Sequence, residues 1–115
     1  MLLLCNNEDV KKKVEIDIRA GKELKNFPKE VQARFVAMFT ILERDGYLHL
    51  PYGKRINTQL FEIRIKYQGQ WRSLYAYLDK FWVIILSAFL KKTQKTPIKE
   101  IKKALNRLKQ YQEVI

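Results

Sequence analysis

The sequence predicts a small α+β domain in which an antiparallel β-sheet meander carries two main helices, in the order β-α-β-β-β-α. Three observations point to this class. The chain has 115 residues, which fits one compact domain. Segments between residues 61 and 90 have strand character and are separated by short turn signals. Two further segments, after Pro28 and after Pro97, place apolar residues at helical spacings.

The N-terminal residues 1–11 show neither a helical nor a strand period, so we expect a loose extension there and a single domain over residues 12–115. A strand is predicted over residues 13–19, because Val14, Ile16 and Ile18 alternate with charged residues. We expect Gly21 to end this strand.

The first helix is predicted to begin after Phe27, since Pro28 suits the start of a helix and Glu30 favours the positive end of its dipole. Asp45-Gly46 is expected to end it. The apolar residues of the predicted helix form one face: Val31, Phe35, Met38, Phe39 and Leu42.

A loop is expected over residues 47–57, ending near the basic pair Lys54-Arg55, and three strands follow. The alternating segment 61–67 and the return strand 71–78 are joined by a short hairpin connection. A second turn at Asp79-Lys80 leads into residues 81–90, which are apolar on both faces. This last run is therefore predicted to lie inside the sheet.

A basic loop over residues 91–96 leads to the final helix. We expect Thr96 to be its N-cap and Pro97 its first residue. Its predicted apolar stripe consists of Ile98, Ile101, Leu105 and Leu108.

The charge of the chain points to an anionic partner. Lys and Arg number 23 against 12 Asp and Glu, giving a formal charge of +11, while 47% hydrophobic and 12% aromatic content supports a folded core. Because basic side chains that neutralise phosphates release counterions, nucleic acid is the first expectation. An anionic membrane or an acidic protein are the alternatives.

Several kinds of chemistry are excluded by composition. Cys5 is the only cysteine, so neither an intramolecular disulfide nor a zinc site made of thiolates can form. His49 is the only histidine, which excludes catalysis by a histidine pair, and we interpret it as a structural or surface residue. No phosphate-binding glycine motif is present, and we expect neither a metal nor a cofactor.

The apolar segments are too short for a signal peptide or a membrane span. Residues 1–4 are apolar but are soon followed by polar residues, and the longest later apolar run is residues 81–90. We therefore expect a cytoplasmic protein with no membrane partner.

Two arginines within predicted strands are the strongest candidates for chemistry. If residues near 66 and 72 pair across the hairpin, Arg64 and Arg72 are neighbours on one sheet face, where guanidinium groups suit phosphate. The alternative is a salt bridge of either arginine to Glu62. A dense basic segment follows, with eight basic residues between Lys91 and Lys109 and Glu100 as the one acid, although a solvated helix face also explains lysines there.

Basic residues can support RNA cleavage as well as binding. When a ribose 2′-hydroxyl attacks the adjacent phosphate, cations stabilise the developing charge. A lysine whose pKa is lowered by neighbouring cations can also take part in the proton transfers, which makes Lys91 and Lys92 candidates.

Three stretches resemble the HigB-type, phage-derived branch of the RelE/ParE toxin superfamily. They are Leu60-Phe61-Glu62-Ile63-Arg64, then Trp71-Arg72-Ser73-Leu74-Tyr75, and then the run from Ile85 to Pro97 followed by Glu100-Ile101. The string that opens with Phe89, Phe-Leu-Lys-Lys-Thr-Gln-Lys-Thr-Pro, is the most specific part. The resemblance spans roughly residues 13–111 and implies a RelE-like fold.

The resemblance implies a toxin of a type II toxin–antitoxin pair. Such toxins cut mRNA as metal-independent endoribonucleases, usually on the translating ribosome, and are silenced by an antitoxin that often has a helix-turn-helix domain. The implied catalytic residues are Arg64, Arg72, Lys91 and Lys92, and the expected RNA-binding residues are Lys54, Arg55, Lys66 and Lys95.

Two positions depart from the family pattern. Ser87 stands where many relatives have histidine, and no tyrosine closely follows Lys92, the next downstream being Tyr111. Two alternatives to the nuclease hypothesis stay open, and the inactive one rests on the departure at Ser87. One is a non-catalytic ParE-like toxin that poisons DNA gyrase, and the other is an inactive member that still binds an antitoxin.

Overall fold

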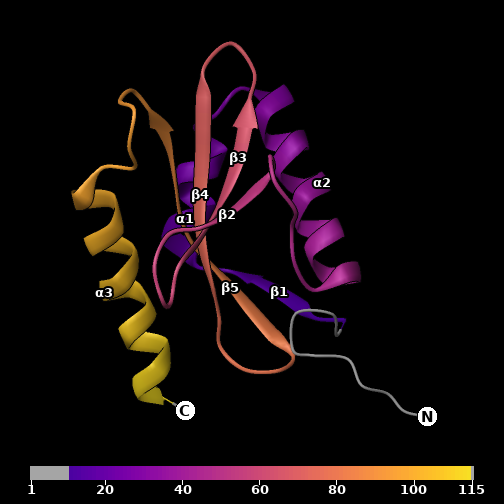
Figure 1. Cartoon of the computed structure of the whole chain (residues 1–115), viewed down its shortest axis with the longest axis vertical. Helices are drawn as coiled ribbons and strands as arrows, with labels where there is room; N and C mark the ends of the chain where they lie inside the picture. The colour runs from indigo at the N-terminus through magenta and orange to yellow at the C-terminus, as the bar shows by residue number, and fades with distance from the viewer. Residues whose placement is uncertain (1–10, 115) are drawn as a thin grey trace.

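A computed structural model, which describes residues 11–114, shows a five-stranded sheet with helices on both faces (Figure 1). The strands lie in the order β1-β5-β4-β3-β2. The predicted α+β class is confirmed. The elements are β1 (Lys13–Ile16), α1 (Ile18–Lys25), α2 (Lys29–Asp45), β2 (Gly53–Arg55), β3 (Phe61–Lys66), β4 (Gln70–Tyr77), β5 (Trp82–Lys91) and α3 (Ile98–Val114).

The N-terminal strand is shorter than predicted and runs parallel to its neighbour. β1 ends at Ile16 and pairs in parallel with β5, so the predictions of a strand to residue 19 and of a purely antiparallel sheet are wrong. The cause is Asp17, whose carboxylate accepts hydrogen bonds from the backbone N–H groups of Arg19 (2.8 Å) and Ala20 (3.4 Å) and caps α1. The additional helix α1 therefore begins where the sequence still alternates, and Gly21 lies inside it.

The predicted loop over residues 47–57 contains β2, a three-residue edge strand that pairs antiparallel with β3. A strand this short has no readable alternation. Gly53 is needed at its start, because an added Cβ would lie 2.6 Å from the Leu48 carbonyl oxygen.

The other strands and turns agree with the sequence. Gln68 and Gly69 take positive φ values of 49° and 139° in the β3–β4 hairpin. In the next turn, the Asp79 carboxylate accepts hydrogen bonds from the backbone N–H groups of Phe81 (2.8 Å) and Trp82 (3.0 Å). β5 lies between β4 and β1, which confirms its predicted interior position.

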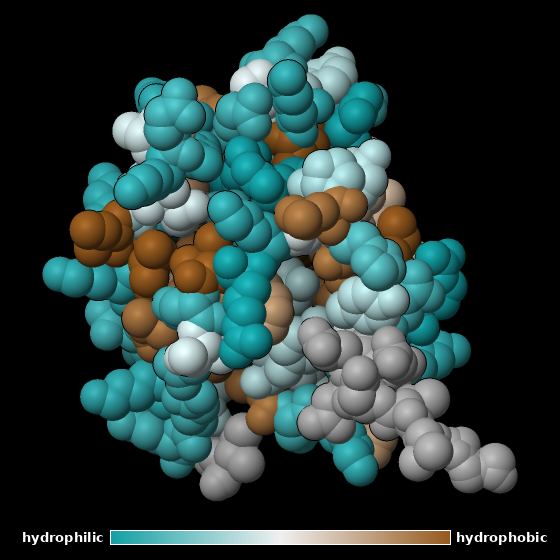
Figure 2. All heavy atoms as spheres, in the orientation of Figure 1, coloured by the Kyte–Doolittle hydropathy of each residue, from teal (hydrophilic) through white to brown (hydrophobic). Residues whose placement is uncertain are grey.

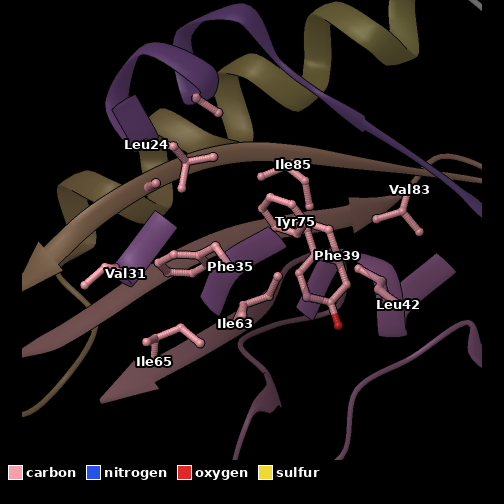
Figure 3. Close-up of a cluster of buried hydrophobic side chains, with 12 residues drawn as sticks. Leu24, Val31, Phe35, Phe39, Leu42, Ile63, Ile65, Tyr75, Val83 and Ile85 are labelled. Carbon is pink, nitrogen blue, oxygen red and sulfur yellow. The ribbon is translucent and has the colours of Figure 1, made fainter. Parts of the chain in front are cut away.

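Helices α1 and α2 cover one face of the sheet and form the first core. The predicted α2 face is buried, apart from Met38, which is half-buried. Gly46 ends α2 in the left-handed conformation with φ 86°, and its N–H donates to the Leu42 carbonyl, as Asp45-Gly46 predicted. Figure 3 shows α2 side chains meeting those of the sheet: Val31, Phe35, Phe39 and Leu42 against Ile63, Ile65, Tyr75, Val83 and Ile85.

Helix α3 covers part of the opposite face and forms the second core. Ala104 and Leu108 are buried there, and Ile101 and Leu105 are half-buried. Ile98 was predicted to belong to this stripe, but it is 70% exposed, so that part of the prediction is wrong. The sheet supplies Leu74, Ala76, Ile84, Leu86 and Phe89, and Leu60, just before β3, joins them.

Helix α3 begins one residue later than predicted, at Ile98. The carbonyl of Pro97 accepts hydrogen bonds from the backbone of Glu100 and Ile101. The Thr96 hydroxyl donates to the Glu62 carboxylate, so the expected N-cap residue instead ties the loop after β5 to β3.

Buried polar groups hold α3 in place. Arg107 donates to the Leu86 carbonyl (2.7 Å) and to both carboxylate oxygens of Glu23 on α1 (3.1 and 3.0 Å). Burial would raise the pKa of Glu23, but hydrogen bonds from Arg107, the Ala88 backbone and Lys103 outweigh it and lower the pKa. These bonds fix the helix relative to β5, whose end carries the candidate site.

The same end of α3 also contacts α1 through Tyr111. Its hydroxyl donates to Asp17 (2.6 Å), which also pairs with Arg19 (2.8 Å). Burial and this bond raise the pKa of Tyr111 to about 12. Tyr111 therefore has a structural role.

The loose extension expected over residues 1–11 lies outside the described residues, apart from Lys11. Within residues 11–114, no helix is both long and apolar enough to cross a membrane.

Candidate active site

Toward the β3–β4 hairpin, the sheet face that carries α3 changes from apolar to polar. Ile63 and Ile65 point into the first core, whereas Glu62, Arg64 and Lys66 alternate with them, which confirms the predicted orientation of β3. Figure 2 shows hydrophilic residues gathered along the middle of the view, between α3 and α2. Cross-strand pairing sets the polar residues in rows: Lys54 with Glu62, Arg64 with Arg72, and Lys66 with Gln70 and Lys91.

The two strand arginines are direct cross-strand partners, which confirms that they are neighbours on one sheet face. The predicted pairing of residues near 66 and 72 is off by two residues, because Lys66 pairs with Gln70. Arg72 is buried, with 3% exposure, and donates to the Trp71 carbonyl (3.0 Å) and to the side-chain oxygen of Gln70 (3.1 Å). The side chain of Arg64 is 31% exposed. Arg72 is therefore fixed in place, whereas Arg64 is open to solvent.

Glu62 is the buried counterion of this pair. Its carboxylate lies 3.7 Å from Nε of Arg64 and 3.6 Å from Nε of Arg72, and its side chain is 2% exposed. Both predicted arrangements are therefore present: the two arginines are neighbours, and each also forms a salt bridge to Glu62. Burial lowers the pKa of Arg72, Glu62 opposes that shift and Arg64 adds to it.

A groove of about 580 Å³ brings the predicted catalytic residues together. Lys91 and Lys92 lie at the end of β5 and just after it, and they share this groove with the arginine pair. Burial lowers the pKa of Lys91, and the positive charge of Arg72 lowers it further. The residues that line the groove are Arg64, Gln70, Arg72, Lys91, Lys92, Thr93 and Gln94.

The four predicted RNA-binding residues divide into two groups. Lys54 lies across from Glu62, and its charge contributes to the lowered pKa of Lys91. Lys66 lines a second, smaller hollow that shares the arginine pair with the groove.

The other two predicted RNA-binding residues lie apart from the arginine pair. Arg55 is placed over the ring of Phe61 and donates to the carbonyls of Asn57 and Thr58, so it is held at the edge of the sheet. Lys95 is exposed in the loop before α3 and does not line the groove.

Ser87 and His49 take no part in the groove. Ser87 is fully buried, and its hydroxyl has no hydrogen-bond partner among the described residues. His49 is exposed and packs edge-on against Tyr47, consistent with the predicted surface role.

Two residues that the sequence analysis did not single out, Gln70 and Tyr52, line a hollow together with the arginine pair. Gln70 was expected in the hairpin connection, but it is the first residue of β4 and pairs with Lys66. Within residues 11–114, no three His, Cys, Asp or Glu residues are grouped so as to hold a metal ion.

Comparisons with known proteins agree with this architecture. The family model "Phage derived protein Gp49-like (DUF891)" matches residues 22–109. A search of curated proteins gives no match.

Two solved structures are similar to the chain. One is the toxin–antitoxin complex RelBE2 from Mycobacterium tuberculosis, with TM-score 0.56 and 26% identity, covering 71% of this chain and 93% of that chain. The other is a mutant of the E. coli toxin RelE in the free state, with TM-score 0.66 and 17% identity, covering 85% of this chain and 98% of that chain. The resemblance to the RelE/ParE superfamily is confirmed: the chain belongs to the Gp49-like family of phage-derived proteins and has a RelE-like fold.

Proposed function

We propose that this protein is the toxin of a type II toxin–antitoxin pair and a metal-independent endoribonuclease that cleaves mRNA on the translating ribosome. One observation carries the proposal: Arg64 and Arg72 face each other across two strands and share one solvent-open groove with Lys91 and Lys92. The similarity to a structure described as a toxin–antitoxin complex supports the toxin role.

The groove suits phosphate cleavage by an internal nucleophile. The ribose 2′-oxygen bonds to phosphorus while the bond from phosphorus to the 5′-oxygen breaks, which leaves a 2′,3′-cyclic phosphate and a 5′-hydroxyl. The arginine pair holds the phosphate and stabilises the charge that develops on its oxygens. Glu62 is the counterion that pairs with both guanidinium groups.

Lys91 is the proposed proton donor to the departing 5′-oxygen. Its lowered pKa makes the ammonium group a stronger acid than an ordinary lysine, and it regains a proton from water after each turnover. The proton of the 2′-hydroxyl leaves to solvent. Lys92, exposed beside the groove, adds positive charge near the leaving group.

The proposed partner that silences the toxin is a cognate antitoxin of the helix-turn-helix type. A chain of net charge +11 suits an acidic segment that covers the groove, because opposite charges speed association and favour the matching partner. Lys99 and Lys102 are exposed on α3 and extend the basic surface beyond the groove.

Induced expression in a bacterial host, followed by primer extension on abundant transcripts, tests this function. The variant of choice is Arg64→Ala, since Arg64 is partly exposed whereas loss of the buried Arg72 also threatens folding. Arg34→Ala is a matched control, because Arg34 is an exposed arginine on α2.

We expect new 5′ ends inside translated regions with the wild type and the Arg34 variant, and none with the Arg64 variant. DNA breaks with intact transcripts would overturn the proposal in favour of a gyrase poison. Normal growth with intact transcripts would indicate an inactive member.

A further inference from the structure

Tyr52 lies directly beside the arginine pair, on the turn that leads into β2. The pairing of Gly53 with Ile63 makes Tyr52 and Arg64 the next pair along, and the Arg64 N–H donates to the Tyr52 carbonyl at 2.8 Å. Cross-strand partners present their side chains on the same face. Tyr52, Arg64 and Arg72 therefore form a row across three neighbouring segments.

A second hollow, of about 290 Å³, lies on the Tyr52 side of this row. It shares three lining residues with the larger groove, so the two hollows meet at the arginine pair. The lining consists of Pro51, Tyr52, Arg64, Lys66, Gln70 and Arg72. A phosphate held by the arginines thus has a lysine-lined groove on one side and an aromatic hollow on the other.

The ring of Tyr52 is free to bind a ligand. It is 52% exposed, and within residues 11–114 its side chain makes no hydrogen bond, ring contact or cation contact. The other five tyrosines of the chain, at positions 47, 67, 75, 77 and 111, all have such a contact. Nothing within the fold therefore accounts for this ring at the mouth of a cationic site.

We propose that the Tyr52 hollow is a nucleobase subsite, in which the base of the nucleotide next to the scissile phosphate stacks on the Tyr52 ring. This inference rests on the proposed function and adds to it a contact to the base. Single-stranded nucleic acid is held by basic grooves that track phosphates and by aromatic rings on which bases stack. Gln70, fixed by Arg72, lines the same hollow and presents its amide to the edge of the bound base.

Binding of uncleavable RNA tests the subsite. The probes are a 2′-O-methyl oligoadenylate and an abasic 2′-O-methyl ribose-phosphate chain of equal length, measured at low salt. Stacking on one aromatic side chain is worth about 10- to 100-fold in affinity. Tyr52→Leu is therefore expected to weaken oligoadenylate binding by about that factor and to leave abasic-chain binding unchanged.

Tyr52→Phe keeps the ring and is expected to bind both probes like the wild type. Since Tyr52 is exposed, neither variant should change the unfolding midpoint by more than a few degrees, which a thermal melt checks. Equal loss on both probes, or no loss with Tyr52→Leu, would overturn the base subsite.

Arg64→Ala separates this result from a failure of the proposed function. If it weakens binding of both probes while Tyr52→Leu has no selective effect, the phosphate site stands and the base subsite is wrong. If Arg64→Ala changes neither, the cationic groove does not bind RNA, and both proposals fall.

Discussion

Replacing Glu62 by glutamine should destabilise the protein by leaving two arginines without their buried counterion. The substitution keeps the shape of the side chain and an oxygen that accepts from Thr96, but it removes the negative charge 3.6–3.7 Å from both Nε atoms. Breaking a buried ion pair from one side costs about 3–5 kcal/mol. Arg64 can turn to water, and Arg72 keeps its hydrogen bonds to the Trp71 carbonyl and the Gln70 side chain. We therefore expect a loss of about 2–3 kcal/mol in the free energy of unfolding.

Thermal and urea unfolding measure this effect, and a loss of that size lowers the melting temperature by about 10 °C. Inorganic phosphate should raise the melting temperature of Glu62→Gln more than that of the wild type, because an anion replaces the missing charge. Glu30→Gln is a matched control, since Glu30 forms an exposed pair with Arg34 at 3.0 Å and should change stability by less than about 1 kcal/mol. Wild-type stability of Glu62→Gln, or an equal response of both proteins to phosphate, would refute the counterion role.

Three further outcomes follow from the packing and the pKa shifts. Phe35→Ala should lower the free energy of unfolding by about 3–5 kcal/mol in a urea titration. Val36→Ala, on the exposed side of α2, should change it by less than about 0.5 kcal/mol. Similar values for the two variants would contradict the burial of Phe35 in the first core. Burial would raise the pKa of Asp17, but hydrogen bonds from Arg19 and Tyr111 hold this pKa well below its usual range. The ionised Asp17 therefore stabilises the fold above about pH 4, and this stabilisation is lost as the pH falls further. Asp17→Asn should therefore be less stable at neutral pH and lose less stability on acidification; an unchanged pH profile of unfolding would count against this bond network. Lys91→Met should slow RNA cleavage by about 10²–10⁴-fold. The rate of the wild type should fall at high pH, at a pH below the ordinary lysine pKa, and this fall should be absent in Lys91→Met. A variant that keeps the fall would show that another group donates the proton.

Much of the fold follows from local patterns. The buried face of α2, the β3–β4 hairpin and the interior position of β5 were predicted, because alternation and helical spacing directly reflect which side chains face a core. Helix α1 was missed because a single residue, Asp17, turns the chain while the apolar alternation continues. The parallel pairing of β1 with β5 joins segments about 70 residues apart, and no local signal records it.

The candidate site was predicted where it depends on one hairpin register. That Arg64 and Arg72 are neighbours on one face follows from a short connection and the period of a strand, although the exact pairing differs by two residues, and the lysines at the end of β5 then fall beside the pair. The placement of Arg55 could not be predicted, since Lys54 and Arg55 are adjacent in sequence but point to different sides of a strand. Tyr52 was missed because β2 itself was unrecognised, and only its pairing with β3 brings that ring to the site.

The proposed reaction is tested most directly by cutting mRNA with the purified protein on programmed ribosomes and identifying the chemical groups at the ends of the fragments. Attack by the 2′-hydroxyl predicts upstream fragments ending in a 2′,3′-cyclic phosphate and downstream fragments beginning with a 5′-hydroxyl, with cutting lost in Arg64→Ala. Fragments with 5′-phosphate and 3′-hydroxyl ends, or cutting that persists without Arg64, would contradict catalysis by this arginine and lysine groove.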